Sequence, residues 1–149
     1  MENLNLPTYS FKIKSEDNRK YIFDEIRRKY ILITPEEWVR QNFIMYIIKE
    51  KNYPQQLISV EMEFKINKLS KRCDIVVFNK EGKPNLIIEC KSPAVTINQG
   101  TFDQITNYNI SFNVDYLIIT NGLKHYCCKF IPKDKKFSFI EEIPEYSTL

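Results

Sequence analysis

The sequence predicts an α/β fold in which helices flank a central mixed sheet. Helical periodicity begins at residue 34 and again at residue 99, and three short runs (75–78, 86–88 and 117–119) are apolar on both faces. Strands buried on both faces belong in the middle of a covered sheet. A chain of 149 residues with 43% hydrophobic residues fits one domain, 1–149. We expect an N-terminal strand-like extension, 1–33, and a core, 34–149.

The first helix has a clear N-terminus. Thr34 is suited to the N-cap, Pro35 to the first helical position, and Glu37 completes a capping box. Apolar residues recur at helical spacing as far as about Lys51: Trp38, Val39, Phe43, Tyr46 and Ile47. Asn52-Tyr53-Pro54 ends the helix.

Before this helix, residues 11–14 alternate like a strand, 15–18 have the composition of a turn, and 21–23 fit a returning strand. The basic triplet 27–29 follows. It fits either a solvated face or a contact with nucleic acid.

After the helix, the sequence predicts strands and one more helix. The expected elements are a strand at 58–66, a polar turn at 67–71, a strand at 72–78, a turn at 79–84, a strand that begins at 86–88, a helix from 99 to about 112, a strand at 117–120, a hairpin turn at Asn121-Gly122, a strand at 123–131 and a last strand at 137–140. The core order is therefore α-β-β-β-α-β, followed by a C-terminal hairpin.

Composition excludes several classes of protein. The chain has three glycines and no GxxxxGK[ST] or GxGxxG motif, so we expect no nucleotide-binding loop. One histidine and no GxSxG argue against a serine hydrolase. A net charge of +3 is compatible with nucleic acid without implying it. We found no signal peptide and no apolar stretch of membrane-spanning length, and we expect a cytoplasmic protein.

The four cysteines, Cys73, Cys90, Cys127 and Cys128, lie in apolar, strand-like runs without CxxC spacing. This pattern favours buried, reduced side chains. A zinc site gathered from three strands is the alternative.

The chemistry is expected at the end of two central strands. If Phe78 lies opposite Asn85 across the intervening loop, the same register places Asp74 opposite Glu89. Lys91 shares the face of Glu89 because side chains alternate along a strand.

Two adjacent carboxylates repel each other, so a cation is expected between them. All the ligands on this face are oxygens, which favours a hard divalent ion such as Mg²⁺. A neighbouring lysine would then orient the attacking water or stabilise negative charge, as phosphodiester hydrolysis requires. The alternative is a structural ion cluster, in which Lys91 neutralises Asp74 and Glu89.

The pattern of Asp74 followed by Glu89-Cys90-Lys91 after an apolar strand resembles the PD-(D/E)XK nuclease signature. Gln104 and Tyr108 match the QxxxY element that follows this signature in the N-terminal nuclease domain of type I restriction enzyme R subunits. The resemblance extends over roughly residues 20 to 145 and implies a restriction-endonuclease-like fold. Cys73 departs from the signature, which has proline before the aspartate, but that proline is not chemically required.

The resemblance implies a role for each matching residue. Asp74 and Glu89 would be metal ligands and Lys91 the catalytic lysine. Gln104 and Tyr108, four residues apart on one helical face, would hold DNA or order the site, or else belong to an ordinary helix surface. Glu37 corresponds to an acid of the first helix that often joins the metal site, although its capping position is also a complete explanation.

The sequence thus predicts a Mg²⁺-dependent endonuclease-like protein, with Mn²⁺ as a substitute ion and DNA as the expected nucleic acid. The alternative is a non-catalytic nucleic-acid-binding or protein-interaction module on the same fold. Further expected partners are a separately encoded motor or specificity protein and a second copy of the chain in a homodimer.

Overall fold

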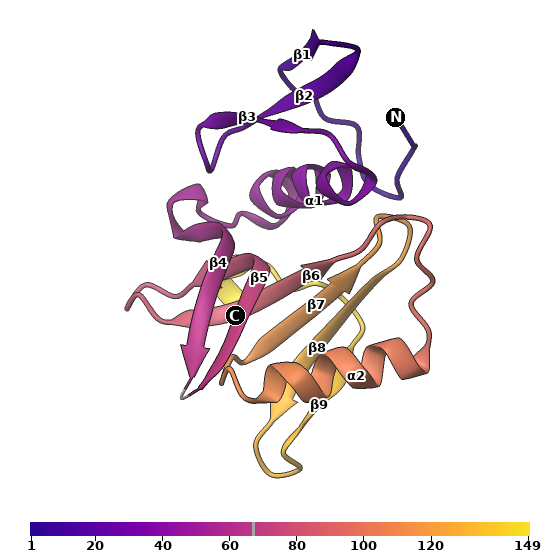
Figure 1. The fold of residues 1–149 in the computed structure, drawn as a ribbon. Coiled ribbons are helices and arrows are strands. Elements are labelled where there is room, and N and C mark those ends of the chain that lie inside the picture. The colour runs from indigo at the N-terminus through magenta and orange to yellow at the C-terminus, as the bar shows by residue number, and fades with distance from the viewer. Residues whose placement is uncertain (67) are drawn as a thin grey trace.

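The computed structural model describes residues 1–66 and 68–149, and within these ranges it contains two sheets and two α-helices (Figure 1). A small N-terminal sheet contains β1 (Ile13–Glu16), β2 (Arg19–Asp24) and β3 (Lys29–Leu32). The larger sheet contains β4 (Ile58–Ile66), β5 (Leu69–Phe78), β6 (Pro84–Cys90), β7 (Tyr116–Thr120), β8 (His125–Ile131) and β9 (Lys136–Ile140). The helices are α1 (Pro35–Lys51) and α2 (Gln99–Ile110), and two 3-10 turns occupy Gln55–Leu57 and Tyr146–Thr148.

The larger sheet is mixed. Its strands lie in the order β4-β5-β6-β7-β8-β9, and each neighbouring pair is antiparallel except β6 and β7. The parallel pair is joined through α2, because a parallel connection needs a long crossover. The predicted α/β class with a mixed sheet is confirmed.

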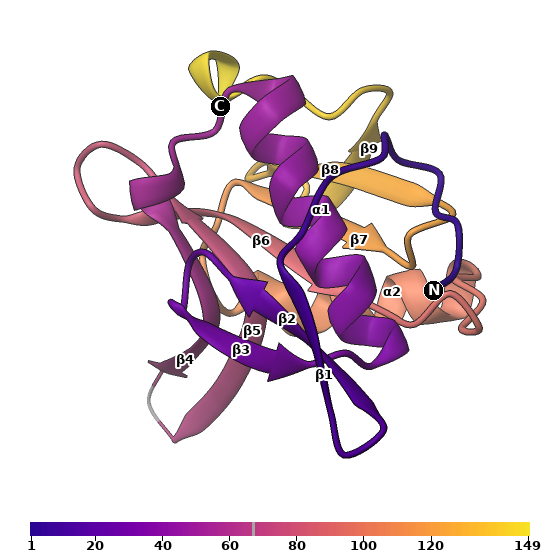
Figure 2. The same cartoon turned by 90° about the horizontal axis from the view of Figure 1, so that it is seen from above.

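The two helices cover opposite faces of this sheet (Figures 1 and 2). On one face, Val39 and Phe43 of α1 pack against Ile75 and Ile88. The other face is covered by α2 and has its own core: Phe102, Phe112, Val76, Ile87 and Leu117. The central strands are therefore apolar on both faces, as the sequence indicated.

Some of the predicted helix and strand boundaries are confirmed and others are wrong. Thr34 Oγ1 accepts a hydrogen bond from the Glu37 N–H at 3.0 Å, so the predicted N-cap of α1 is confirmed. The second helix ends at Ile110, two residues before the predicted end. Strand β5 begins at Leu69, so the predicted turn at 67–71 is wrong for residues 69–71, and Asn67 lies outside the described residues. Pairing with β4 outweighs the turn preference of these polar residues.

The register between β5 and β6 is confirmed at its centre, where Val76 lies opposite Ile87. It is wrong at the loop. Phe78 lies opposite Pro84 instead of Asn85 because the register shifts between Val77 and Phe78.

The hairpin between β7 and β8 is also confirmed, but with a four-residue loop, 121–124, in place of a tight two-residue turn. The Asn121 side chain closes this loop by accepting hydrogen bonds from the N–H groups of Leu123 and Lys124. Gly122 has a φ of +84°, and a Cβ there would lie 2.7 Å from the Leu4 side chain. Only glycine fits that position. The C-terminal hairpin, β8 with β9, is confirmed.

The N-terminal extension folds into its own antiparallel sheet beside α1 (Figure 2). Its first strand begins two residues later than predicted, and its turn is Asp17-Asn18, both with positive φ. The four cysteines are buried and unbridged, as expected from their apolar runs.

Candidate metal and nucleic-acid site

Asp74 lies where β5 runs beyond the end of β6. The last pair that joins the two strands is Ile75 with Ile88, and β6 ends at Cys90. One residue beyond that pair, Asp74 Oδ2 accepts a hydrogen bond from the Cys90 N–H at 2.7 Å. The Asp74 carboxylate therefore binds the last residue of β6, Cys90, which directly follows Glu89 in the chain.

The direction in which side chains point changes at this place in β5. Cys73 packs in the core on the α2 side and Ile75 in the core on the α1 side, although strict alternation would put both on one face. Glu61 in the neighbouring strand β4 has a φ of 55°, a left-handed conformation that is uncommon outside glycine. Such irregularities disrupt the ladder locally and re-aim side chains. Asp74 is thereby left between the two faces.

On the α1 side, Asp74 faces Arg40. Arg40 Nη1 lies 3.8 Å from Asp74 Oδ1 and 3.0 Å from Glu61 Oε1, while Nη2 lies 3.1 Å from Glu37 Oε2. Arg40 is 4% exposed, and its buried Nε has no hydrogen-bond partner among the described residues. Glu36 Oε1 lies 4.0 Å from the same Nη2, so one guanidinium is shared by four carboxylates.

A second arginine extends this network to the N-terminal sheet. Glu37 Oε1 accepts hydrogen bonds from Arg27 Nη2 at 2.5 Å and Gln41 Nε2 at 2.8 Å. Arg27 and Gln41 also donate to the fully buried Asp24, at 2.6 and 2.9 Å. Both oxygens of Glu37 thus contact protein donors, in addition to its role at the helix N-terminus. Its role as a metal ligand stays a prediction.

Burial and charge shift the pKa values of this network. The pKa of Asp74 is raised to about 7, because burial and the charge of Glu89 outweigh the Cys90 hydrogen bond and Arg40, which lower it. For Arg40, burial lowers the pKa, but the carboxylates of Glu37 and Asp74 outweigh burial and raise it. The guanidinium is therefore a permanent charge at this site.

On the α2 side, Glu89 has a different partner. Lys71 of β5 forms an ion pair with Glu89 Oε1, an oxygen that is buried and accepts no well-formed hydrogen bond. Lys71 Nζ also donates to Asn109 Oδ1 at 2.8 Å and lies 4.9 Å from the centre of the Tyr108 ring. Only 9% of the Lys71 side chain is exposed. This lysine is a built-in counter-ion for Glu89.

An open cleft of about 680 Å³ lies between α2 and the end of β6. It is lined by Lys71, Glu89, Lys91, Thr101, Gln104, Ile105, Asn107, Tyr108 and Asn109. Lys91 is half-buried, and its N–H donates to the Thr120 carbonyl at 2.8 Å, which fixes its backbone beside β7. No carboxylate of the described residues lies within 4.0 Å of its ammonium.

The cleft gathers four of the six residues singled out from the sequence: Glu89, Lys91, Gln104 and Tyr108. Asp74 adjoins Glu89, while Glu37 lies behind Arg40 in the α1-side network. Within the described residues, no three carboxylate, histidine or cysteine side chains come together as a metal site.

Lys71 was missed from the sequence because it fell in a predicted turn. Continuing the strand back to residue 69 would have placed its side chain with Cys73, on the α2 side. Asp24, Arg27, Gln41 and Glu61 were also missed. Their contacts join elements that are distant in the chain, and no local pattern encodes them.

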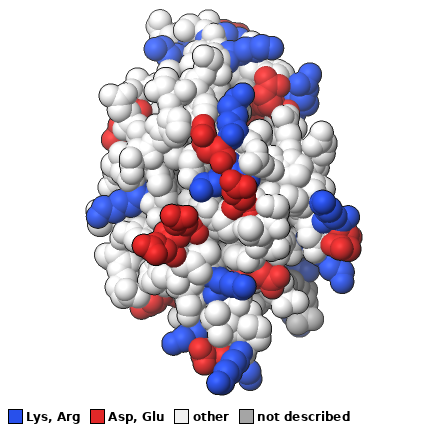
Figure 3. Space-filling model, turned by 180° about the vertical axis from the view of Figure 1, so that it is seen from behind, with Lys and Arg blue, Asp and Glu red and all other residues white. Residues whose placement is uncertain are grey.

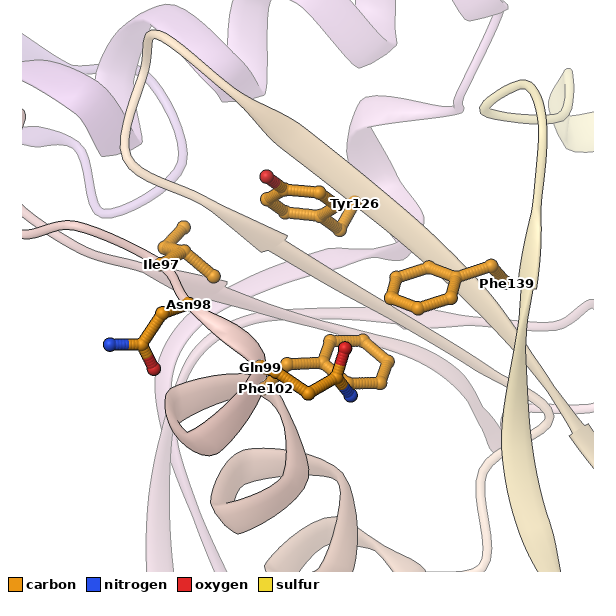
Figure 4. A pocket seen from close by; sticks show the side chains of 6 residues that line it. All are labelled: Ile97, Asn98, Gln99, Phe102, Tyr126 and Phe139. Carbon is orange, nitrogen blue, oxygen red and sulfur yellow. The ribbon is translucent and has the colours of Figure 1, made fainter.

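A second hollow, of about 90 Å³, lies at the N-terminus of α2 (Figure 4). The labelled side chains in Figure 4 are mainly apolar: Ile97, Asn98, Gln99, Phe102, Tyr126 and Phe139. The rings of Phe102 and Phe139 stack with centroids 4.2 Å apart. With no carboxylate, lysine or histidine in its lining, this hollow lacks the groups for phosphodiester chemistry.

The mixed sheet between two helices, with acids on adjoining central strands and a polar cleft beside them, defines a restriction-endonuclease-like α/β fold. The family model of the type I restriction enzyme R protein N terminus matches residues 35–144, and the chain belongs to that family. A search of curated proteins gives no match. In the described part of the chain, no helix is both long and apolar enough to cross a membrane.

Proposed function

We propose that this protein is a Mg²⁺-dependent nuclease that hydrolyses phosphodiester bonds, with DNA as its substrate. The observation that carries the proposal is the placement of Asp74, in the middle of β5, beside the end of β6 that carries Glu89, with Lys91 in the neighbouring cleft, in a member of a restriction enzyme family.

The donor set fits a hard divalent cation. Asp74 and Glu89 supply carboxylate oxygens, and no thiol or imidazole competes among the residues that line the cleft. The raised pKa of Asp74, caused by burial and the charge of Glu89, supports the binding of a cation there. Asp74 and Glu89 would hold Mg²⁺ or Mn²⁺, with Glu37 as a further candidate ligand. The ion would polarise the phosphate and lower the pKa of a bound water.

The remaining groups would act directly on the substrate. Lys91 would orient the attacking water and stabilise the charge that develops on the phosphate. Gln104 and Tyr108 line the cleft from α2, where they would hold the nucleic-acid strand. The Tyr108 hydroxyl donates to the Ser70 carbonyl at 3.4 Å, which fixes the ring beside Lys71.

We further propose that the protein acts in the cytoplasm with a separately encoded motor or specificity protein, or as a homodimer. The sequence has no nucleotide-binding loop, and one site per chain cuts one strand at a time.

Cleavage of plasmid DNA, labelled oligonucleotides and RNA in Mg²⁺, Mn²⁺ or EDTA tests the proposal. We expect the wild type to cleave only when the divalent ion is present, and we expect Lys91→Ala to abolish cleavage. Equal cleavage by wild type and Lys91→Ala would assign the activity to a contaminant or another site.

The second candidate is a non-catalytic module that binds nucleic acid or protein. The internal cations favour it, because Lys71 and Arg40 already neutralise Glu89 and Asp74. Salt-dependent binding to DNA with neither cleavage nor divalent-ion binding would establish this alternative.

A further inference from the structure

The N-terminal sheet presents a surface that the nuclease site does not use. Strands β1–β3 precede residue 35, where the family match begins. One face of the sheet turns toward the molecule, with Ile22 and Asp24 fully buried. The opposite face is open, and Figure 3 shows Lys and Arg side chains crowded at this end of the molecule.

The strand register places aromatic side chains together on the open face. Phe23 lies opposite Tyr30, and Tyr21 lies opposite Leu32. Because side chains alternate along a strand, these four lie on the face opposite to that of the buried Ile22. The Phe23 and Tyr30 rings meet edge to face with centroids 5.2 Å apart. Tyr30 is 40% exposed and Leu32 is 38% exposed. This is an aromatic platform on a sheet, not part of a buried core.

Cationic side chains lie over these rings. Lys14 Nζ is 4.5 Å from the Tyr30 centroid and 5.9 Å from that of Tyr21. Lys12 and Arg28 lie 5.5 and 5.6 Å from the Phe23 centroid. Alternation along the strands places Lys12, Lys14 and Arg19 on the face of Tyr21 and Phe23, together with one acid, Glu16, which lies 3.6 Å from Lys14. Arg28 pairs with Glu25 at 3.1 Å. The open face therefore carries excess positive charge.

We propose that the open face of β1–β3 binds single-stranded nucleic acid. Lys12 and Lys14 would swing away from the rings to contact the backbone phosphates, and bases would then stack on Tyr21, Phe23 and Tyr30. A single strand is favoured over a duplex because only unpaired bases expose their faces to aromatic side chains.

The position of the sheet relates this surface to the nuclease site. Arg27, in the β2–β3 loop, pairs with Glu37 of α1 and lies 3.6 Å from Glu61 of β4. The loop is thus fastened to the network that contacts Asp74. If the protein is a nuclease, as proposed above, this surface would bind the single-stranded form of its substrate. The binding itself requires no divalent ion.

Fluorescence anisotropy with a labelled 20-nucleotide oligo(dT) in EDTA tests the proposal, with a duplex of equal length and an acidic polyglutamate peptide as competitors. We expect Lys14→Ala/Tyr30→Ala to weaken oligo(dT) binding about twentyfold, through one lost stacking surface and one lost phosphate contact. Tyr30→Phe should bind within about twofold of wild type, because it keeps the ring. These side chains are exposed, and thermal unfolding should show that the variants remain folded.

Lys136→Ala/Phe139→Ala is the matched control. It removes the same kinds of side chain from β9, where Phe139 is 53% exposed, and should leave binding unchanged. Asp74→Asn should also keep oligo(dT) binding while losing cleavage, so that failure of the nuclease proposal and failure of this one remain distinguishable. The proposal would be overturned if the wild type did not bind oligo(dT), if it bound the duplex with equal affinity, or if polyglutamate displaced oligo(dT) as well as the unlabelled oligonucleotide does. Unchanged binding by Lys14→Ala/Tyr30→Ala would also overturn it.

Discussion

Asp74 and Glu89 lie on adjoining strands but in opposite kinds of surroundings. Asp74 faces a buried network in which Arg40 and Arg27 link Glu37, Glu61 and Asp24. Glu89 faces an open cleft and has one lysine as its counter-ion. The first environment is fixed from many sides. The second depends on a single lysine, Lys71, whose place beside Glu89 a divalent ion could take.

This difference indicates that the two sides of the site have different roles. Buried ion networks rarely add net stability, but removing one member leaves an uncompensated charge. The α1-side network therefore holds Asp74 in place and fastens the N-terminal sheet. The α2-side pair places Glu89 and its one counter-ion in the lining of the cleft.

The largest effect is expected from breaking the α1-side network. Arg40→Met should lower the free energy of unfolding by about 3 kcal/mol, because Glu37 and Asp74 lose their shared cation. Urea unfolding measures the change. Arg72→Met is the control, since Arg72 is 67% exposed and lies 3.9 Å from the same Glu61. Its effect should stay within about 0.5 kcal/mol, and equal losses in the two variants would contradict the contrast.

Breaking the α2-side pair should cost less. Lys71→Met should lower stability by about 2 kcal/mol without divalent ions, because Glu89 loses its counter-ion but adjoins the cleft. Mn²⁺ should restore most of that loss by taking the place of the ammonium. Lys129→Met removes an exposed lysine of β8 and should change stability little, with or without Mn²⁺. Absence of rescue in Lys71→Met would show that the ion does not reach Glu89.

The raised pKa of Asp74 predicts a stabilising substitution. Its pKa in the folded protein, about 7, lies above its ordinary value of 3.8, so the folded state binds the proton more tightly than the unfolded state. Wild-type stability should therefore fall as the pH rises from about 4 to 7, and stay low above that.

Asp74→Asn removes this dependence and keeps an acceptor for the Cys90 N–H. Without divalent ions, it should raise Tm by roughly 5 °C at pH 8 and have little effect at pH 4. Calorimetry at several pH values measures this. A lower Tm at pH 8 would mean that the attraction to Arg40 outweighs burial.

The smallest effect on stability is expected at Gln104. Its side chain is exposed, so Gln104→Ala should change the free energy of unfolding by less than about 0.5 kcal/mol. Cleavage should nevertheless weaken with Mn²⁺ affinity unchanged, because the residue would contact nucleic acid and not the ion. A parallel loss of Mn²⁺ affinity would place Gln104 in the metal site instead.

Local patterns predicted most of the fold. The N-cap at Thr34, the doubly apolar strands and the Asn121-Gly122 hairpin each depend on residues close in the chain. The Glu37 carboxylate bonds Arg27 and Gln41 instead of completing the predicted capping box. The errors arose where tertiary pairing decided the outcome. Pairing with β4 extended β5 back to Leu69, and a register shift moved Phe78 opposite Pro84.

The candidate site was predictable in its acids and not in its cations. Strand register predicted that Asp74 and Glu89 lie on adjoining strands, but the pairing ends at Ile75 with Ile88, and Asp74 faces Arg40 while Glu89 faces Lys71. Gln104 and Tyr108 were singled out by the resemblance to the QxxxY element. Arg27 and Lys71 reach their carboxylates only through folding, from a loop of the N-terminal sheet and from a strand extension that the sequence assigned to a turn. Sequence spacing predicted which acids lie near each other in the fold, but it did not predict which cationic side chains pair with them.

The central claim is that Asp74 and Glu89 form a divalent-ion site. Titration of Mn²⁺ into the full chain by isothermal calorimetry tests it most directly, because it does not require an activity that depends on a partner. We predict saturable binding by wild type, at least tenfold weaker binding by Asp74→Asn and by Glu89→Gln, and unchanged binding by Lys91→Ala. No binding by wild type, or equal binding by all four proteins, would contradict the account.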